Sequence, residues 1–314
     1  MDKSVCIYHR TDLDGHCAGA LVKLFVPDVE LAGYDYADKI TADQLVTLHE
    51  IDKETRVFMV DFSLQPFEEM LKLKIACKSL IWCDHHKTAI EDYVKYDTDE
   101  DVALFGGYQS LGLAGCELTW KWFKPKSFAP KFVKYLGRYD VWDHKDLNVM
   151  PFQYGMRAYD TNPMNMEWGT DDPNVWERIF NNNVSEDVIV KDGAAILRYV
   201  AKDNKVLVES TYFMCHVGQL KCIAVNKLGG NASVFDVMWD EKKYDAMLIF
   251  GYTGTNWRFS LYTTKTLVDV GSVAKCFGGG GHAQAAGWVM SQLPFYVTGD
   301  VEDGRNVLRI PIPE

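Results

Sequence analysis

The sequence predicts an α/β protein with two domains. Over the first 85 residues, short apolar runs alternate with segments whose apolar residues recur at helical spacing, which is typical of a parallel sheet covered by helices. A long helical pattern then separates this region from a second set of strand-like runs. We therefore expect an N-terminal domain with a mainly parallel sheet and helices on both faces, a linker helix, a smaller C-terminal α/β domain, and an active site in the cleft between the domains.

The N-terminal elements follow one another in a regular order. Their strands read as nearly continuous apolar runs, as expected when both faces of a sheet are buried. The predicted strands are 5–8, 30–34, 56–60 and 79–83, and the predicted helices are 15–25, 41–48, 66–75, 113–123 and 130–136. The stretch 144–173 is rich in aromatic residues, Asn, Pro and Asp. We expect it to be irregular and to form a lid or a wall of the site.

The second half of the chain begins with a helical pattern at 185–208. The strands expected after it are 215–216, 220–225, 246–250 and 258–262, with helices near 231–238 and 270–276. The predicted division is an N-terminal domain at 1–184, a linker helix at 185–208 and a C-terminal domain at 209–314.

Composition bounds the class of protein. The chain has 314 residues, of which 47% are hydrophobic and 25% charged, as in ordinary globular proteins. The sequence has no 18-residue apolar run and no signal-peptide pattern at its start, so we expect a cytoplasmic protein without a membrane segment. The eight cysteines form no CxxC pair, and we interpret them as reduced core residues.

The formal net charge is -11. Proteins that grip long nucleic acid usually carry a basic face that displaces counterions. This balance therefore argues against a long nucleic acid as partner, and a nucleotide substrate would be short. Acidic residues that gather near histidines are also what a site for divalent cations requires.

Carboxylates and imidazoles follow three of the four predicted N-terminal strands. The first strand is followed by His9, Asp12 and Asp14, the third by Asp61, and the fourth by Asp84, His85 and His86. Because ligands bind at the carboxyl ends of parallel strands, these side chains are expected to converge. A mixed Asp and His set favours manganese-type ions over magnesium alone.

Each of these residues also has a purely structural interpretation. D-L-D-G at 12–15 is good N-cap and turn chemistry, Asp61 can cap the next helix, and Asp140 can be a solvated loop acid. If two ions bind about 3.5–4 Å apart, they need a shared ligand, and Asp61 is the natural candidate.

The ordered motifs resemble one known family. These are H-R-T-D-L-D-G (9–15), V-D-F-S (60–63), C-D-H-H (83–86), Y-D-V-W (139–142) and F-G-G-G-G-H-A-Q-A-A-G (277–287). Together they resemble the DHH phosphoesterase superfamily with its DHH-associated C-terminal domain. That family includes exonucleases, nanoRNases that cut short RNA, and cyclic-dinucleotide phosphodiesterases.

The resemblance implies a metal-dependent phosphoesterase with two divalent ions, usually Mn²⁺, with Mg²⁺ or Co²⁺ as alternatives. It assigns one ion to His9, Asp12 and Asp61, and the second to Asp14, Asp61, His85 and Asp140. Within the triplet, it leaves Asp84 behind the metal ligand to orient an imidazole. His86 would face the substrate phosphate as a donor or proton source.

In the C-terminal domain, the resemblance assigns the glycine run to the nucleotide. Gly279, Gly280 and Gly281 would allow close backbone approach, and His282 would add a directional donor; a tight turn is the structural alternative. The chain departs from the family in two places. Only two residues separate His9 from Asp12, where many members have three, and Tyr262 stands where many members have an arginine, so Arg258, Lys265 or Lys227 would have to bind the phosphate instead.

These inferences predict hydrolysis of very short RNA or linear dinucleotides, such as pGpG, to mononucleotides. A 3′-phosphoadenosine 5′-phosphate phosphatase and a cyclic-dinucleotide phosphodiesterase are alternatives, and an inactive nucleotide-binding protein is the alternative outside the enzymes. The sequence leaves open whether the chain forms a homodimer.

Overall fold

The computed structural model describes residues 3–96 and 105–313. The chain divides into two compact units, 1–197 and 198–314, which are described separately. The boundary falls inside the long helix α9 (Glu186–Thr211). The predicted domain boundaries and the predicted cleft between domains stay predictions.

The first unit is built on a four-stranded sheet in the order β2-β1-β3-β4. Every neighbouring pair of strands in it is parallel. The strands are β1 (Ser4–His9), β2 (Glu30–Tyr34), β3 (Arg56–Val60) and β4 (Ser79–Cys83). The predicted parallel sheet is therefore confirmed, and its carboxyl edge carries the polar residues that follow β1, β3 and β4.

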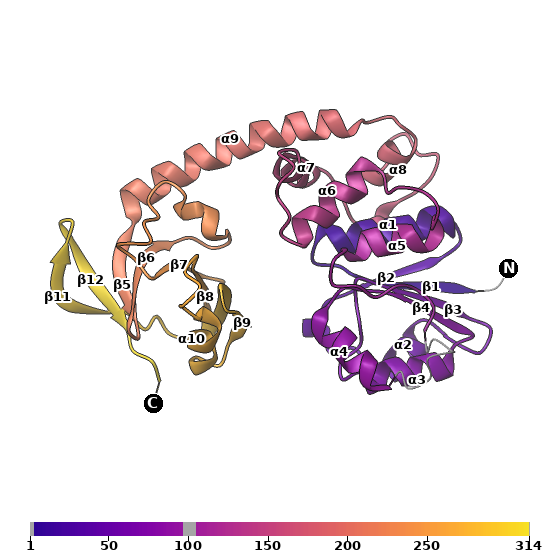
Figure 1. Cartoon of the computed structure of the whole chain (residues 1–314), viewed down its shortest axis with the longest axis horizontal. Helices are drawn as coiled ribbons and strands as arrows, with labels where there is room; N and C mark the ends of the chain where they lie inside the picture. The colour runs from indigo at the N-terminus through magenta and orange to yellow at the C-terminus, as the bar shows by residue number, and fades with distance from the viewer. Residues whose placement is uncertain (1–2, 97–104, 314) are drawn as a thin grey trace. The chain divides into compact units, whose positions relative to one another are not determined.

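Helices cover both faces of this sheet, as predicted (Figure 1). Alternate residues of a strand point to opposite faces: Cys6 and Tyr8 of β1 join one apolar core, and Val5 and Ile7 join the other. The first core is closed mainly by α1 (Leu13–Phe25), α5 (Gly115–Phe123), α6 (Lys131–Asp140), α7 (Val149–Met156) and α8 (Val175–Phe180). The second is closed by α2 (Ala42–Leu48), α3 (Glu68–Ala76) and α4 (Lys87–Tyr96).

Two predictions for the first unit are wrong in detail. Helix α6 runs on to Asp140, so this aspartate lies in the last helical turn and not in a loop after it. The stretch 144–173 is not wholly irregular, because it contains α7 and a short 3₁₀ helix, Pro163–Asn165. The proline of α7 sits in the first turn, where its missing N–H costs nothing, and Phe152 and Met156 supply a buried apolar face.

The second unit contains an eight-stranded mixed sheet in the order β11-β12-β5-β6-β7-β8-β10-β9. Its strands are β5 (Phe213–Val217), β6 (Leu220–Asn226), β7 (Ala246–Tyr252), β8 (Trp257–Tyr262), β9 (Gly280–His282), β10 (Ala285–Met290), β11 (Tyr296–Glu302) and β12 (Arg305–Ile310). Helix α10 (Val270–Cys276) packs on one face, and the end of α9 with a 3₁₀ turn, Ala232–Phe235, packs on the other.

The mixed α/β class predicted for the C-terminal part is confirmed, although two expectations for it need correction. The helix expected near 231–238 is only the short 3₁₀ turn, which the Asn231 side chain caps at Ser233 N. All eight cysteines are free thiols, but Cys276 is exposed and is not a core residue. No helix in the described part of the chain is both long and apolar enough to span a membrane.

Candidate metal centre

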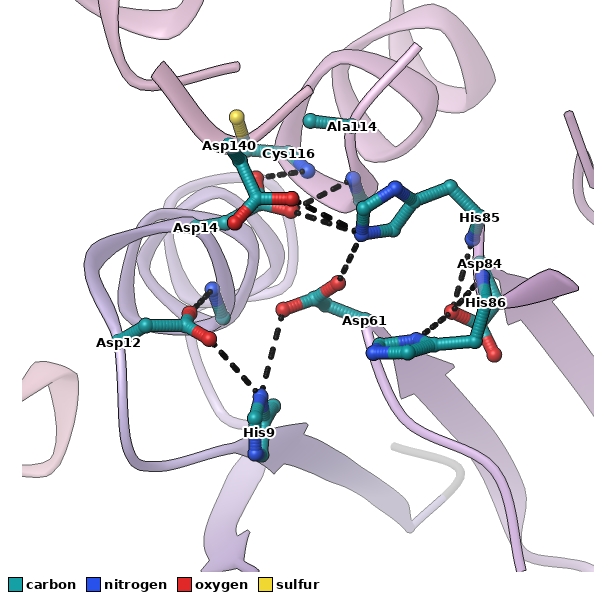
Figure 2. Close-up of polar contacts among 12 residues, drawn as sticks. His9, Asp12, Asp14, Asp61, Asp84, His85, His86, Ala114, Cys116 and Asp140 are labelled. Atoms are coloured by element: carbon teal, nitrogen blue, oxygen red, sulfur yellow. Dashed lines mark hydrogen bonds and ion pairs between the residues drawn. The ribbon is translucent and has the colours of Figure 1, made fainter. Parts of the chain in front are cut away.

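The carboxyl edge of the first sheet brings six predicted metal ligands together (Figure 2). His9 is the last residue of β1, Asp61 follows β3 directly, and His85 lies just beyond β4. Three carboxylates complete the group from helices that pack against this edge: Asp12 and Asp14 at the start of α1, and Asp140 at the end of α6. The convergence expected from the parallel sheet therefore exists in the fold.

The ligand atoms form two overlapping sets. In the first, His9 Nδ1 lies 3.0 Å from Asp12 Oδ2 and 3.8 Å from Asp61 Oδ2. In the second, His85 Nε2 lies 3.2 Å from Asp61 Oδ1, 3.2 Å from Asp140 Oδ2 and 3.7 Å from Asp14 Oδ2. The two oxygens of Asp61 thus face different histidines, which is the arrangement that a ligand shared between two ions requires.

The spacing of these atoms also suits metal coordination. Within the described residues, the buried atoms His9 Nδ1 and Asp61 Oδ1 have no hydrogen-bond partner, although an imidazole or carboxylate atom lies 3.0–3.2 Å from each. Two atoms bound at right angles to one ion at about 2.1 Å are about 3.0 Å apart. Carboxylate oxygens with imidazole nitrogens also suit Mn²⁺, so the residues present fit a divalent pair.

Electrostatics favours a cation at this place. Burial raises the pKa of Asp14, and the nearby charges of Asp61 and Asp140 raise it further. Burial and then the charge of Asp61 raise the pKa of Asp140 to about 6. Asp61 is the exception: burial raises its pKa, but the imidazoles of His85 and His9 outweigh burial and hold it below the usual range. Divalent ions would offset this concentration of negative charge.

Asp12 fulfils its structural and its predicted functional role with different atoms. Its Oδ1 accepts a hydrogen bond from Gly15 N at 2.9 Å and so caps helix α1. Its Oδ2 remains turned toward His9. The N-cap interpretation and the metal-ligand interpretation therefore do not exclude each other.

Asp14 is held by the start of a distant helix. Its two carboxylate oxygens accept hydrogen bonds from Gly115 N at 2.7 Å and Cys116 N at 2.8 Å, the first backbone N–H groups of α5. Helix N-termini stabilise carboxylates in this way. The fold thereby fixes a buried carboxylate, 3% exposed, next to His85.

Gly115 also makes room for Asp61. A Cβ atom at this position would lie 2.5 Å from Asp61 Cβ and 2.7 Å from Asp61 Oδ1, which is closer than such atoms approach. Asp61 itself has a positive φ of 53°, an uncommon conformation for a residue other than glycine. Sequence analysis missed Gly115, because its contact with Asp61 spans a long stretch of chain and leaves no local signal.

The three residues of the D-H-H triplet have different contacts. His85 faces the other candidate metal ligands, whereas Asp84 binds and orients His86. Asp84 Oδ1 accepts hydrogen bonds from His86 Nδ1 at 2.6 Å and from the backbone N–H groups of His85 and His86. Its Oδ2 accepts from Trp82 Nε1 at 3.2 Å, a partner that sequence analysis also missed. Since His86 Nδ1–H donates its hydrogen bond to Asp84, the ring's Nε2 is left for another partner.

His86 is therefore poised as a donor. Burial lowers the pKa of this imidazole, but the hydrogen bond and charge of Asp84 outweigh burial and raise the pKa to about 9. Its ring lies 4.9 Å from the ring of His85 and 5.4 Å from that of Tyr36, centroid to centroid. The side chain thus stands at the edge of the metal cluster: it is in neither trio around His9 or Asp140, but it forms a third trio of possible ligands with Asp61 and His85.

The predicted substrate-binding residues lie in the second unit. Gly279, Gly280, Gly281 and Arg258 line a cavity of about 830 Å³ between β8, β9 and β10. Gly281 has a φ of 138°, and the backbone of Ala285 and Ala286 would lie within 2.6 Å of a Cβ there, so glycine is needed for this close strand pairing. His282 is exposed and lies outside the cavity lining.

Comparison with known proteins agrees with this architecture. No protein-family model matches the chain. It is 25% identical over 304 residues to oligoribonuclease NrnB of Bacillus subtilis, covering 90% of this chain and 71% of that protein. It is also 25% identical over 316 residues to an uncharacterized protein of Acanthamoeba polyphaga mimivirus, covering 92% and 68%.

A solved structure with the same fold is the DHH domain of a member of the s1p family of ribosomal proteins. The TM-score is 0.55 at 14% identity, covering 92% of this chain and 82% of that one. The chain resembles the DHH superfamily in the order of its motifs, and this solved structure shows the same fold. The fold that the resemblance implies is thus confirmed, and the metal-dependent phosphoesterase class stays a proposal. The individual roles of its residues stay predictions.

Proposed function

We propose that this protein is a DHH-type phosphoesterase that hydrolyses very short RNA and linear dinucleotides, such as pGpG, to mononucleotides with a pair of divalent ions, Mn²⁺ first among them. The observation that carries the proposal is the position of the Asp61 carboxylate, whose two oxygens face His9 and His85 from the centre of six ligand side chains. The relationship to an oligoribonuclease supports the substrate class.

The residues of the chain divide the work around the reacting phosphate. Two ions held by the six ligands would activate a water molecule and offset the charge on the attacking and leaving oxygens. Asp84 holds the His86 ring in place through Nδ1, which leaves Nε2 to donate to a phosphate oxygen or to protonate the leaving oxygen. The N-terminus of α5 fixes the Asp14 carboxylate in its position beside His85.

A short substrate agrees with the charge of the molecule. The net charge is -11, which is unfavourable for a long polyanion. In the second unit, by contrast, no Asp or Glu of the described chain lines the 830 Å³ glycine cavity or the neighbouring cavity of about 280 Å³. These two cavities are suited to hold one end of a small anionic substrate.

Arg258 is the best candidate for the phosphate-binding cation that Tyr262 does not supply. It lines both cavities, and its side chain has no hydrogen bond or ion pair within the described part of the chain. Lys265 is already paired with Asp245 Oδ1 at 2.8 Å. Lys227 lines the smaller cavity but donates to Asn204 Oδ1 at 3.0 Å, so it would assist Arg258.

A substrate panel tests the proposal directly. The panel contains short RNAs of graded length, pGpG, cyclic dinucleotides and 3′-phosphoadenosine 5′-phosphate, each incubated with Mn²⁺. We expect turnover to be fastest for two to a few nucleotides. Preferred hydrolysis of the phosphomonoester or of a cyclic dinucleotide would transfer the assignment to that alternative.

Substitutions of the candidate metal ligands and of Arg258 test whether these residues are needed for the hydrolysis of pGpG. Asp61→Asn and His85→Ala should each abolish most of the hydrolysis of pGpG and lower the bound Mn²⁺, while Asp171→Asn, at an exposed position, should change neither. Arg258→Gln should raise the KM for pGpG and leave the metal content unchanged. Full activity in both Asp61→Asn and His85→Ala would contradict the two-metal proposal.

A further inference from the structure

A cavity in the first unit opens beside the metal cluster and is assigned to nothing so far. It has a volume of about 340 Å³ and lies between the start of α1, the end of α6 and helix α7. Three predicted metal ligands, Asp12, Asp14 and Asp140, form one wall, and Gln153 of α7 and Arg157, the C-cap residue of α7, belong to the other. We call this cavity the α7 pocket. A group bound in it would lie next to a phosphate held at the metal centre.

Arg157 gives the α7 pocket a free positive charge. Its guanidinium lies over the rings of Tyr154, at 4.7 Å, and Tyr139, at 5.8 Å, and Nη2 donates to Tyr139 Oη at 3.3 Å. No carboxylate of the described chain lies within ion-pair distance of it. Two tyrosines thus hold the side chain in place, while most of its donors remain available for an anion.

Gln153 gives the α7 pocket an unused acceptor. It lies one helical turn before Arg157, so both side chains emerge on the same face of α7. The residue is only 5% exposed, yet its Oε1 has no hydrogen-bond partner in the described part of the chain. A buried acceptor without a partner is unfavourable, and a bound donor would remove this cost.

The two groups differ in the chemistry they accept. Arg157 donates hydrogen bonds and suits phosphate oxygens, whereas Gln153 Oε1 accepts and suits a hydroxyl group. A sugar phosphate carries both kinds of group within a few ångströms. A volume of 340 Å³ is at the low end for small-molecule sites, which run from about 300 Å³ upward, so it suits one such unit and not a longer chain.

We propose that the α7 pocket binds the ribose phosphate unit next to the scissile bond, with Arg157 on the phosphate and Gln153 on a ribose hydroxyl. This inference rests on the proposed function, because it names the part of the nucleotide substrate that this pocket takes. Arg157 and Gln153 act here as substrate-binding residues and not as metal ligands.

Ribose 5-phosphate, inorganic phosphate and adenosine 5′-monophosphate are the probes of this proposal. Each is titrated calorimetrically into the full-length, Mn²⁺-loaded protein. Arg157→Gln should weaken ribose 5-phosphate binding about tenfold or more, because a charge-assisted hydrogen bond is lost, and Arg157→Lys should weaken it less. The control Lys191→Gln, at an exposed position on α9, should leave binding unchanged.

Gln153→Leu distinguishes the sugar from the phosphate. It should weaken ribose 5-phosphate but leave inorganic phosphate within about twofold of the unaltered protein, since only the hydroxyl contact is removed. Thermal unfolding and bound Mn²⁺ are measured for each variant, and they should stay unchanged for Arg157→Gln, whose side chain is exposed. In turnover of pGpG, Arg157→Gln should raise KM more than it lowers kcat.

The outcomes separate this inference from the proposed function. If the protein cleaves none of the RNA substrates but Arg157→Gln still weakens ribose 5-phosphate, the pocket assignment stands and the proposed function fails. If ribose 5-phosphate binds equally to Arg157→Gln, Gln153→Leu and Lys191→Gln, the pocket assignment is overturned whatever the enzyme hydrolyses. Binding of adenosine 5′-monophosphate without ribose 5-phosphate would overturn it as well, because the base would then be the anchor.

Discussion

Replacing Gly115 by alanine tests whether the start of α5 is what holds the metal centre in shape. On helix propensity alone, this change would stabilise the protein by about 0.5–1 kcal/mol. The added Cβ, however, would lie 2.5 Å from Asp61 Cβ and 2.7 Å from Asp61 Oδ1, and Asp61 is only 1% exposed. The helix or the aspartate must therefore move.

These contacts set the expected loss of folding stability and of Mn²⁺ affinity in Gly115→Ala. Overpacking of a filled interior costs about 1–3 kcal/mol, which exceeds the gain in propensity. Because the shift acts on the proposed bridging carboxylate, Mn²⁺ affinity should also fall, by about 10–100-fold as for other residues that support metal ligands. Thermal unfolding without metal and calorimetric titration with Mn²⁺ measure the two effects.

Gly112→Ala is the matched control, since a Cβ there would meet nothing within 4 Å. It should leave both the unfolding temperature and Mn²⁺ affinity close to those of the unaltered protein. If Gly115→Ala unfolds at the same temperature and binds Mn²⁺ as tightly as Gly112→Ala, the claim that α5 must approach Asp61 without a side chain is wrong.

Two further predictions concern the triplet and the pH dependence of stability. Asp84→Asn should lower kcat about 10–100-fold with Mn²⁺ retained, because His86 loses the carboxylate that orients it; activity kept at full level would refute that role. Without metal, three groups have a raised pKa: Asp140 (about 6), His86 (about 9) and His9 (about 10, because Asp12 and Asp61 outweigh burial). Each group stabilises the folded state at pH values below its unfolded pKa, and this contribution is lost as the pH rises through its folded pKa. The metal-free protein should therefore melt at a lower temperature at pH 8.5 than at pH 5.5. The stabilisation by Mn²⁺ should be larger at pH 8.5, because its ligands must be deprotonated. Equal melting temperatures at both pH values in the presence of a chelator would contradict the raised pKa values.

Local sequence was sufficient for the first sheet and for the set of candidate ligands. Buried parallel strands are continuous apolar runs, so β1, β3 and β4 stood out, and the polar residues directly after them could be expected at one edge. The motif order then indicated the resemblance to the DHH superfamily. These signals reside within a few neighbouring residues, which is why they can be recognised without the fold.

Other features depend on contacts between distant parts of the chain. Helix α7 was missed because the stretch 144–173 is dominated by aromatic residues, Asn, Pro and Asp, and its helical segment is stabilised by burial of Phe152 and Met156 in the core. The glycine run was assigned to nucleotide binding; Gly280 begins strand β9 and His282 is exposed, and the assignment itself stays a prediction. Tertiary packing decides where both segments lie.

The triplet W-C-D-H-H-K shows where the two kinds of information meet. By itself, the sequence determined that Asp84, His85 and His86 follow a buried strand and that neighbouring side chains cannot all reach one ion. Only the tertiary structure decided that His85 faces Asp61 and Asp140, while Asp84 turns away to bind His86 and Trp82. The physical reason is that each choice depends on partners supplied by other strands and helices, and these become neighbours only when the sheet and its covering helices pack.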